Sequence, residues 1–157
     1  MKNIKHNHPF EKGQSLVEFA ISLTFMLILL AGVVYFGIGL FYYIAMRDAA
    51  QEGALYGSMN PTDAGGIQTR VADAAGPGFI RDLYDAGQLS VNVTYTGAAC
   101  EGNGIIVTLQ HDYELSWLPV GAFLVPFIGD HPCPDGTGQC ILLRARVTDT
   151  ILTPPCP

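Results

Sequence analysis

The chain has 157 residues, with 14 acidic and eight basic side chains, and a formal net charge of −6. This length accommodates one modest domain plus a membrane segment. The part after residue 46 holds five arginines and 12 acidic residues, a difference of −7. This acidic balance argues against a nucleic-acid partner, because nucleic acids favour a basic protein face.

Residues 1–13 form a short basic leader. All three lysines, Lys2, Lys5 and Lys12, lie in it, whereas every arginine follows the long apolar run. Positive charge near the end of a membrane segment favours the cytoplasmic side. The sequence therefore predicts a cytoplasmic N-terminus and a C-terminal domain outside.

A long apolar run follows the leader. From Phe19 to Met46 there are 28 consecutive residues without a charged side chain, and about 20 apolar residues span a bilayer. A cleaved secretory signal has an apolar core of only roughly 7–15 residues, so we expect this segment to stay with the protein. No helix breaker appears before Asn60 and Pro61. The sequence predicts one helix over residues 14–58, longer than the bilayer is thick and projecting beyond it.

The projecting part of this helix carries small residues at every fourth position: Ala45, Ala49, Gly53 and Gly57. They form one ridge, which lets another element approach the helix backbone closely. Glycine in a helix costs about 1 kcal/mol, so close packing would offset that cost. The partner is either the protein's own sheet or a neighbouring helix, and the sequence does not decide between them.

Residues 59–157 predict an α+β head. Two short helices are expected in GGIQTRVADAA and FIRDLYDAG, before the apolar period changes to two. Alternation then predicts strands over Leu89–Gly97, Asn103–Trp117 and Cys140–Leu152, in an antiparallel sheet of about three strands. The intervening Leu118–Gly129 is apolar but rich in Pro and Gly. It is either a loop that caps the core or an exposed patch that contacts a partner or the membrane.

All four cysteines fall on the predicted outer side, where disulfides form. Cys133 and Cys140 bracket CPDGTGQC, whose Pro-Asp-Gly favours a tight turn. We expect these two to pair, which leaves Cys100 with Cys156. The alternative is a metal site that uses His131 with Cys133 and Cys140. The sequence has no CxxC pair, so disulfides are favoured and no metal is expected.

Motifs of catalysis are missing from the sequence. It contains no Ser-His-Asp spacing, phosphate loop, HExxH or dinucleotide motif. His111 is predicted to lie at the surface of a strand. Asp112 and Glu114 share a strand face because they are two apart, and a solvated face explains them. We therefore expect no enzymatic activity, no catalytic residue and no cofactor.

The start of the helix carries a family resemblance. Gly13 followed by QSLVEFA, Gln14 to Ala20, resembles the leader of a type IV pilin-like protein. More narrowly, it is similar to the TadE-like family of minor pseudopilins of tight-adherence (Flp) pilus systems. RDAAQEGALYG, Arg47 to Gly57, is similar to the run in which the family's helix leaves the bilayer.

The resemblance implies processing and an assembly role. A prepilin peptidase would cut after Gly13 and leave a new amine on Gln14. Glu18 would then pair with the amine of an adjacent subunit, since in a low-dielectric setting a paired charge is favoured over a lone one.

The expected function is a non-enzymatic structural subunit of a pilus or secretion system in the bacterial cytoplasmic membrane. Its expected partners are membrane lipid, the peptidase, and other membrane or pilin-like subunits that it contacts through the N-terminal helix. The alternative is an uncleaved single-pass accessory subunit of a larger respiratory or photosynthetic membrane complex. The native N-terminal residue distinguishes the two.

Overall fold

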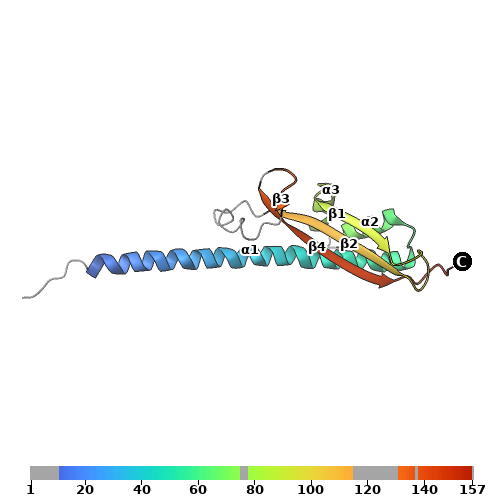
Figure 1. The fold of residues 1–157 in the computed structure, drawn as a ribbon, viewed down its shortest axis with the longest axis horizontal. Coiled ribbons are helices and arrows are strands. Elements are labelled where there is room, and N and C mark those ends of the chain that lie inside the picture. The colour runs from blue at the N-terminus through green and yellow to red at the C-terminus, as the bar shows by residue number, and fades with distance from the viewer. Residues whose placement is uncertain (1–10, 75–77, 115–130, 137, 157) are drawn as a thin grey trace, which may run out of the picture. The chain divides into compact units, whose positions relative to one another are not determined.

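The computed structural model describes residues 11–74, 78–114, 131–136 and 138–156 (Figure 1). Residues 1–10 of the basic leader and the apolar Leu118–Gly129 lie outside this range. The chain divides into two units, residues 1–37 and residues 38–157. The elements in chain order are α1 (Glu11–Met59), α2 (Ala64–Asp73), α3 (Phe79–Asp85), β1 (Leu89–Tyr95), β2 (Gly104–Glu114), β3 (His131–Pro132) and β4 (Gln139–Thr150).

The first unit consists, as far as it is described, of the N-terminal part of α1. This stretch is long and apolar enough to cross a membrane, and none of its most apolar 18-residue window is buried. The hydroxyl of Thr24 donates to the carbonyl oxygen of Ala20 at 2.8 Å, so a polar side chain within the run is satisfied by its own helix. A helix able to span a bilayer is therefore present as predicted.

The second unit contains a four-stranded antiparallel sheet in the order β1-β2-β4-β3. The predicted α+β class and the antiparallel sheet are confirmed. The two-residue strand β3 is an addition to the three predicted strands. The predicted short helices appear as α2 and α3, and Asn60 and Pro61 follow directly on the end of α1.

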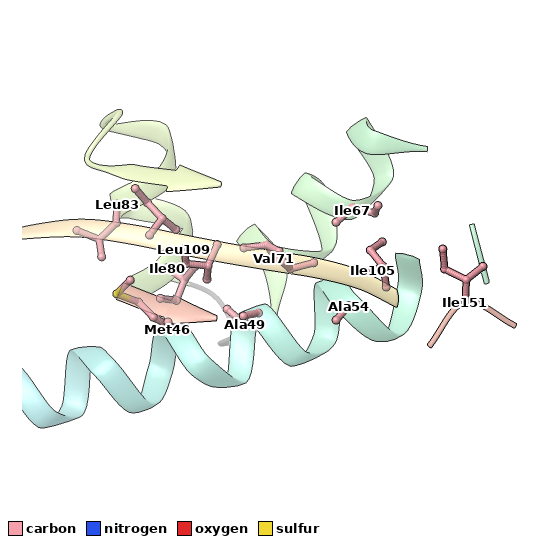
Figure 2. Close-up of a cluster of buried hydrophobic side chains, with 14 residues drawn as sticks. Met46, Ala49, Ala54, Ile67, Val71, Ile80, Leu83, Ile105, Leu109 and Ile151 are labelled. Carbon is pink, nitrogen blue, oxygen red and sulfur yellow. The ribbon is translucent and has the colours of Figure 1, made fainter. Parts of the chain in front are cut away.

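One face of the sheet packs against the helices. The C-terminal part of α1, together with α2 and α3, contributes to one buried apolar cluster (Figure 2). Its largest buried members from the helices are Met46, Ile67, Val71 and Ile80, and from the sheet Ile105, Val107 and Leu109. Residues 38–59 of α1 therefore belong to the same folded unit as the sheet.

The chain end closes this core beside the last turn of α1. Ile151 is fully buried. The next amide, Leu152 N, donates to the carbonyl oxygen of Ser58 at 2.8 Å, and the Thr153 hydroxyl donates to that of Met59 at 2.9 Å. These bonds satisfy carbonyl groups that a helix end leaves without an intrahelical partner.

Candidate functional site

The residues of the predicted processing and assembly site lie together at the start of α1. Gly13, Gln14 and Glu18 are all exposed, and they border one shallow surface hollow with Val17 and Ile21. Glu18 follows Gln14 by four residues, so the two side chains occupy the same helix face one turn apart. The part of the chain that the structure describes therefore leaves this face open to another molecule.

The surroundings of Glu18 are apolar. Leu16, Phe19 and Ile21 expose 71%, 67% and 67% of their surface. In a bilayer, an ionised carboxylate among such side chains is costly unless it reaches water or meets an opposite charge. The site can thus pair chemically with a cation, such as an amine, presented by a neighbouring molecule.

Gly13 has no packing role in the described fold. A Cβ atom built on it would meet no atom within 4 Å. Glycine lowers helix stability by about 1 kcal/mol relative to alanine, and here no close contact offsets that cost. The described fold therefore does not require a glycine at position 13.

The predicted small-residue ridge faces the interior of the second unit. Ala49, Gly53 and Gly57 are buried, and Ala45 is half-buried. A Cβ on Gly53 would overlap the Val71 side chain of α2. A Cβ on Gly57 would overlap the tip of Ile105 in β2 and lie 3.1 Å from Ile67 Cδ1 in α2. The ridge is thus occupied by the protein's own sheet and by its own helix α2.

The cysteines lie in two disulfides. Cys133 pairs with Cys140 across seven residues, and Cys100 pairs with Cys156 across 56 residues; the Cα atoms of each pair are 5.0 Å apart. These are the expected pairings. Because both sulfurs of Cys133 and Cys140 are bonded to each other, they do not supply thiolate ligands for the alternative metal site. His131 instead pairs through Nε2 with Asp112 Oδ1 at 2.9 Å.

The prediction for His111 was wrong. Its side chain is buried, with 6% of its surface exposed, and its Nδ1 lies 3.0 Å from the carbonyl oxygen of Gln88. The imidazole stacks on Tyr42 of α1, with ring centroids 5.3 Å apart and planes 9° apart. Strand alternation places His111 on the same sheet face as Leu109, which packs against the helices. Because the neighbouring residues in QHDYE are polar, the sequence did not show that His111 lies on the buried face of the strand.

Sequence reasoning missed a polar cluster at the turn between α1 and α2. Asp63 caps α2 by accepting a hydrogen bond from Gly66 N at 2.9 Å, and it accepts a second from the Tyr56 hydroxyl at 2.8 Å. The bond from Gly66, followed by that from Tyr56, lowers the pKa of Asp63. The bond to Asp63 in turn raises the pKa of Tyr56. The sequence feature that could have indicated this cap is Asp63 just before the predicted helix, since Asp is a preferred N-cap residue.

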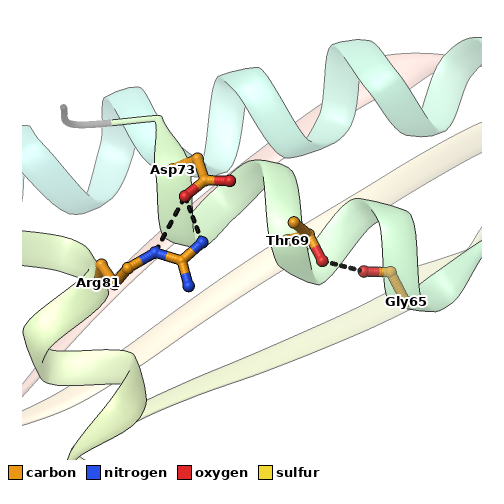
Figure 3. Close-up of polar contacts among 4 residues, drawn as sticks. All are labelled: Gly65, Thr69, Asp73 and Arg81. Carbon is orange, nitrogen blue, oxygen red and sulfur yellow. Dashed lines mark hydrogen bonds and ion pairs between the residues drawn. The ribbon is translucent and has the colours of Figure 1, made fainter. Parts of the chain in front are cut away.

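A second polar contact joins α2 to α3 (Figure 3). Arg81 Nε donates to Asp73 Oδ1 at 3.0 Å, and the guanidinium makes a further contact with the same oxygen. This hydrogen bond raises the pKa of Arg81. Both side chains are about half exposed, so the pair contributes little to stability. The Thr69 hydroxyl donates to Gly65 O at 2.9 Å within α2.

Comparison with known proteins supports the resemblance at the start of the chain. Residues 13–55 match the family model described as TadE-like protein. The match covers Glu18 and most of the small-residue ridge, whereas every strand of the sheet lies outside it. No curated protein and no solved structure matches the chain.

Proposed function

Because residues 13–55 form a TadE-like segment, we propose that this protein is a membrane-anchored structural subunit of a Tad pilus-related assembly. Within that class it acts as a minor pseudopilin and carries no enzymatic activity. The observation that carries the proposal is the position of Glu18. It lies inside the matched segment, exposed at the start of α1, whose most apolar window has no residue buried by the described part of the chain.

The proposed assembly step begins with proteolysis. A prepilin peptidase cuts between Gly13 and Gln14 and leaves an amine on Gln14. Gly13 and Gln14 are both exposed, which is compatible with access by an external protein. The Glu18 carboxylate of one subunit then pairs with the Gln14 amine of the next. In the low dielectric of the bilayer, separation of such a pair leaves two costly lone charges, so pairing registers one helix against its neighbour.

The proposed topology places the sheet-bearing unit outside the cytoplasmic membrane. The three lysines before the apolar run favour retention of the N-terminus in the cytoplasm. The two disulfides of the second unit are typical of an oxidising compartment. Both features support a single-pass protein whose folded unit meets other subunits beyond the bilayer.

The native N-terminus tests the processing step. Intact mass and N-terminal sequencing of protein from native membranes should give a chain that begins at Gln14. A chain that begins at Met1 would contradict the pilin route. That result would favour the uncleaved accessory subunit of a larger membrane complex.

Substitution of Glu18 tests the pairing step separately. Glu18→Gln should leave the head folded and reduce incorporation into the assembly at least tenfold, because the neutral amide no longer offsets the amine charge. The matched control is Glu52→Gln, the same change beyond the apolar run. Co-purification of tagged subunits measures incorporation. Equal incorporation of Glu18→Gln and the control would rule out the pairing role.

A further inference from the structure

Strand β4 presents an edge that the described part of the chain leaves uncovered by any strand. In the order β1-β2-β4-β3, one side of β4 pairs with β2 from Cys140 to Thr150. On the other side, β3 pairs only with Gln139 and Cys140. Figure 1 shows β4 running on well past β3. From Ile141 to Thr150, no described strand lies beside that second edge.

Two backbone hydrogen bonds show which residues of β4 direct their N–H and C=O groups toward this edge. Ile151 N donates to Asn103 O at 2.8 Å, continuing the β2–β4 ladder, so odd-numbered residues of β4 bond to β2. Cys133 N donates to Gly138 O at 3.0 Å, which continues the β3–β4 register. The N–H and C=O groups of even-numbered residues of β4 therefore point away from β2, toward the edge that β3 occupies at its start. Antiparallel ladders alternate in this manner. The residues whose N–H and C=O groups point outward are Leu142, Arg144, Arg146, Thr148 and Thr150. The N–H of Thr150 already donates to Asp149 Oδ1 at 2.8 Å, so the outward N–H groups that an added strand can use run from Leu142 to Thr148.

The side chains of these edge residues are exposed and include two arginines. With the Gln110 amide oriented so that its oxygen faces β4, that oxygen accepts a hydrogen bond from Arg144 Nε at 2.9 Å. Arg146 lies opposite Thr108 and makes no hydrogen bond or ion pair with any residue that the structure describes. A positive pair therefore flanks the edge of a strongly acidic unit.

The charges argue against a second copy of β4 as the occupant. The five outward residues of β4 include two arginines and no acidic residue, and the Asp149 carboxylate at the end of the strand already accepts the Thr150 N–H. Antiparallel pairing of two β4 edges would therefore bring only neutral or positive side chains together, and like charges opposite each other destabilise a sheet. Charged edge strands commonly prevent such self-pairing. A strand with carboxylates would be attracted to the same edge.

We propose that the edge of β4 from Leu142 to Thr148 accepts an extended strand of another protein that carries carboxylates at alternate positions. The strand adds to the sheet through the outward backbone groups, and its carboxylates pair with Arg144 and Arg146. Backbone bonds supply affinity in this mode of recognition, and alternate side chains supply specificity. The proposal does not depend on the role in a pilus.

Peptide binding tests the charge preference. The full chain in detergent micelles is titrated into a fluorescent ten-residue Val/Thr peptide that carries two Glu residues two positions apart. The matched peptide carries Lys at both positions. Anisotropy should show at least tenfold tighter binding of the Glu peptide, and the double variant Arg144→Glu/Arg146→Glu should reverse the preference. Absence of binding, or a preference that the variant leaves unchanged, would overturn the proposal.

A second variant distinguishes strand addition from simple charge attraction. Thr148→Pro removes an outward N–H without removing a bond to β2, and both arginines stay in place. It should weaken binding of the Glu peptide at least tenfold, whereas Thr148→Ala, which keeps the N–H, should bind within about twofold of the native chain. Equal binding by a folded Thr148→Pro variant would mean that charge alone attracts the peptide, and strand addition would be excluded.

Hydrogen exchange of the native chain provides a test that requires no variant. On addition of the Glu peptide, the amides of Arg144, Arg146 and Thr148 should exchange at least tenfold more slowly, because they become hydrogen-bonded. Unchanged exchange with peptide bound would refute the inference. So would a dimer in sedimentation experiments that Thr148→Pro abolishes, since the occupant would then be a second copy of the chain.

Discussion

Residues 13–37 and 38–59 belong to one helix, α1, yet they have opposite relations to their surroundings. In the first stretch, large apolar side chains are exposed, and the most apolar window has no buried residue. In the second, Met46, Ala49 and Ala54 are fully buried in the protein's own core. Both stretches are helical, so the difference lies in whether other elements of the described chain pack against the helix.

Glycine illustrates the difference most simply. A Cβ on Gly32 or Gly37 would meet no atom within 4 Å, whereas a Cβ on Gly53 or Gly57 would overlap a neighbouring side chain. The same residue type is open to the surroundings in one stretch and required by close approach in the other. A small-residue pattern in a membrane protein therefore indicates close packing only where a partner element exists.

The largest expected effect concerns the disulfides, which restrain only the second unit. Removal of the 56-residue bridge by Cys100→Ser/Cys156→Ser should cost about 4 kcal/mol of unfolding free energy, and Cys133→Ser/Cys140→Ser, which opens a seven-residue bridge, about 2 kcal/mol. Denaturant unfolding in detergent measures both. The N-terminal stretch of α1 should remain helical by hydrogen exchange. Loss of that helix together with the head would show that the two regions fold as one.

A charge in the first stretch should affect insertion and leave the head unchanged. Leu29→Arg places a guanidinium near the middle of the apolar run and should cost about 3 kcal/mol of membrane insertion. The control is Leu55→Arg, also on α1 and exposed in the second unit. Membrane fractionation should detect a loss for the first variant only. Comparable loss for both would erase the distinction between the two stretches.

A bulky residue on the ridge should affect the head and leave insertion unchanged. Gly53→Leu forces a side chain into the space of Val71 and Ile67, and should cost about 2 kcal/mol through overpacking. Gln51→Leu adds the same side chain at an exposed position of the same helix and should change stability little. Thermal unfolding distinguishes them. Equal melting temperatures would mean that the ridge does not pack as described.

The smallest expected effect concerns the cap at Asp63. Asp63→Ala removes the acceptor for Gly66 N and the Tyr56 hydroxyl, and should lower the melting temperature by a few degrees at pH 7. The folded-state pKa of Asp63 lies below its ordinary value of 3.8, so its contribution exists above that value and is lost as the pH falls through the lowered pKa. Melting curves of both proteins should therefore converge below that pH. A gap that persists in acid would exclude the carboxylate as its source.

Much of the fold followed from local patterns. The uncharged run from Phe19 to Met46 predicted a helix able to cross a membrane, and period-two alternation predicted three of the four strands. The short strand β3 escaped prediction because two residues are too few to show a period. The burial of His111 escaped because its neighbours are polar, whereas burial depends on which sheet face the helices cover.

The sequence by itself determined the long apolar helix, the resemblance at Gly13 to Glu18, the end of that helix at Asn60 and Pro61, and the positions of the longer strands. Each of these features depends on residues that are neighbours in the sequence. Only the tertiary structure decided that Gly53 packs on Val71 rather than on another protein, and that Arg144 and Arg146 lie on an edge of β4 beside which the described residues place no strand. Those features depend on register and on contacts between segments far apart in the chain. The local sequence pattern does not specify such contacts, since they form only when the elements pack.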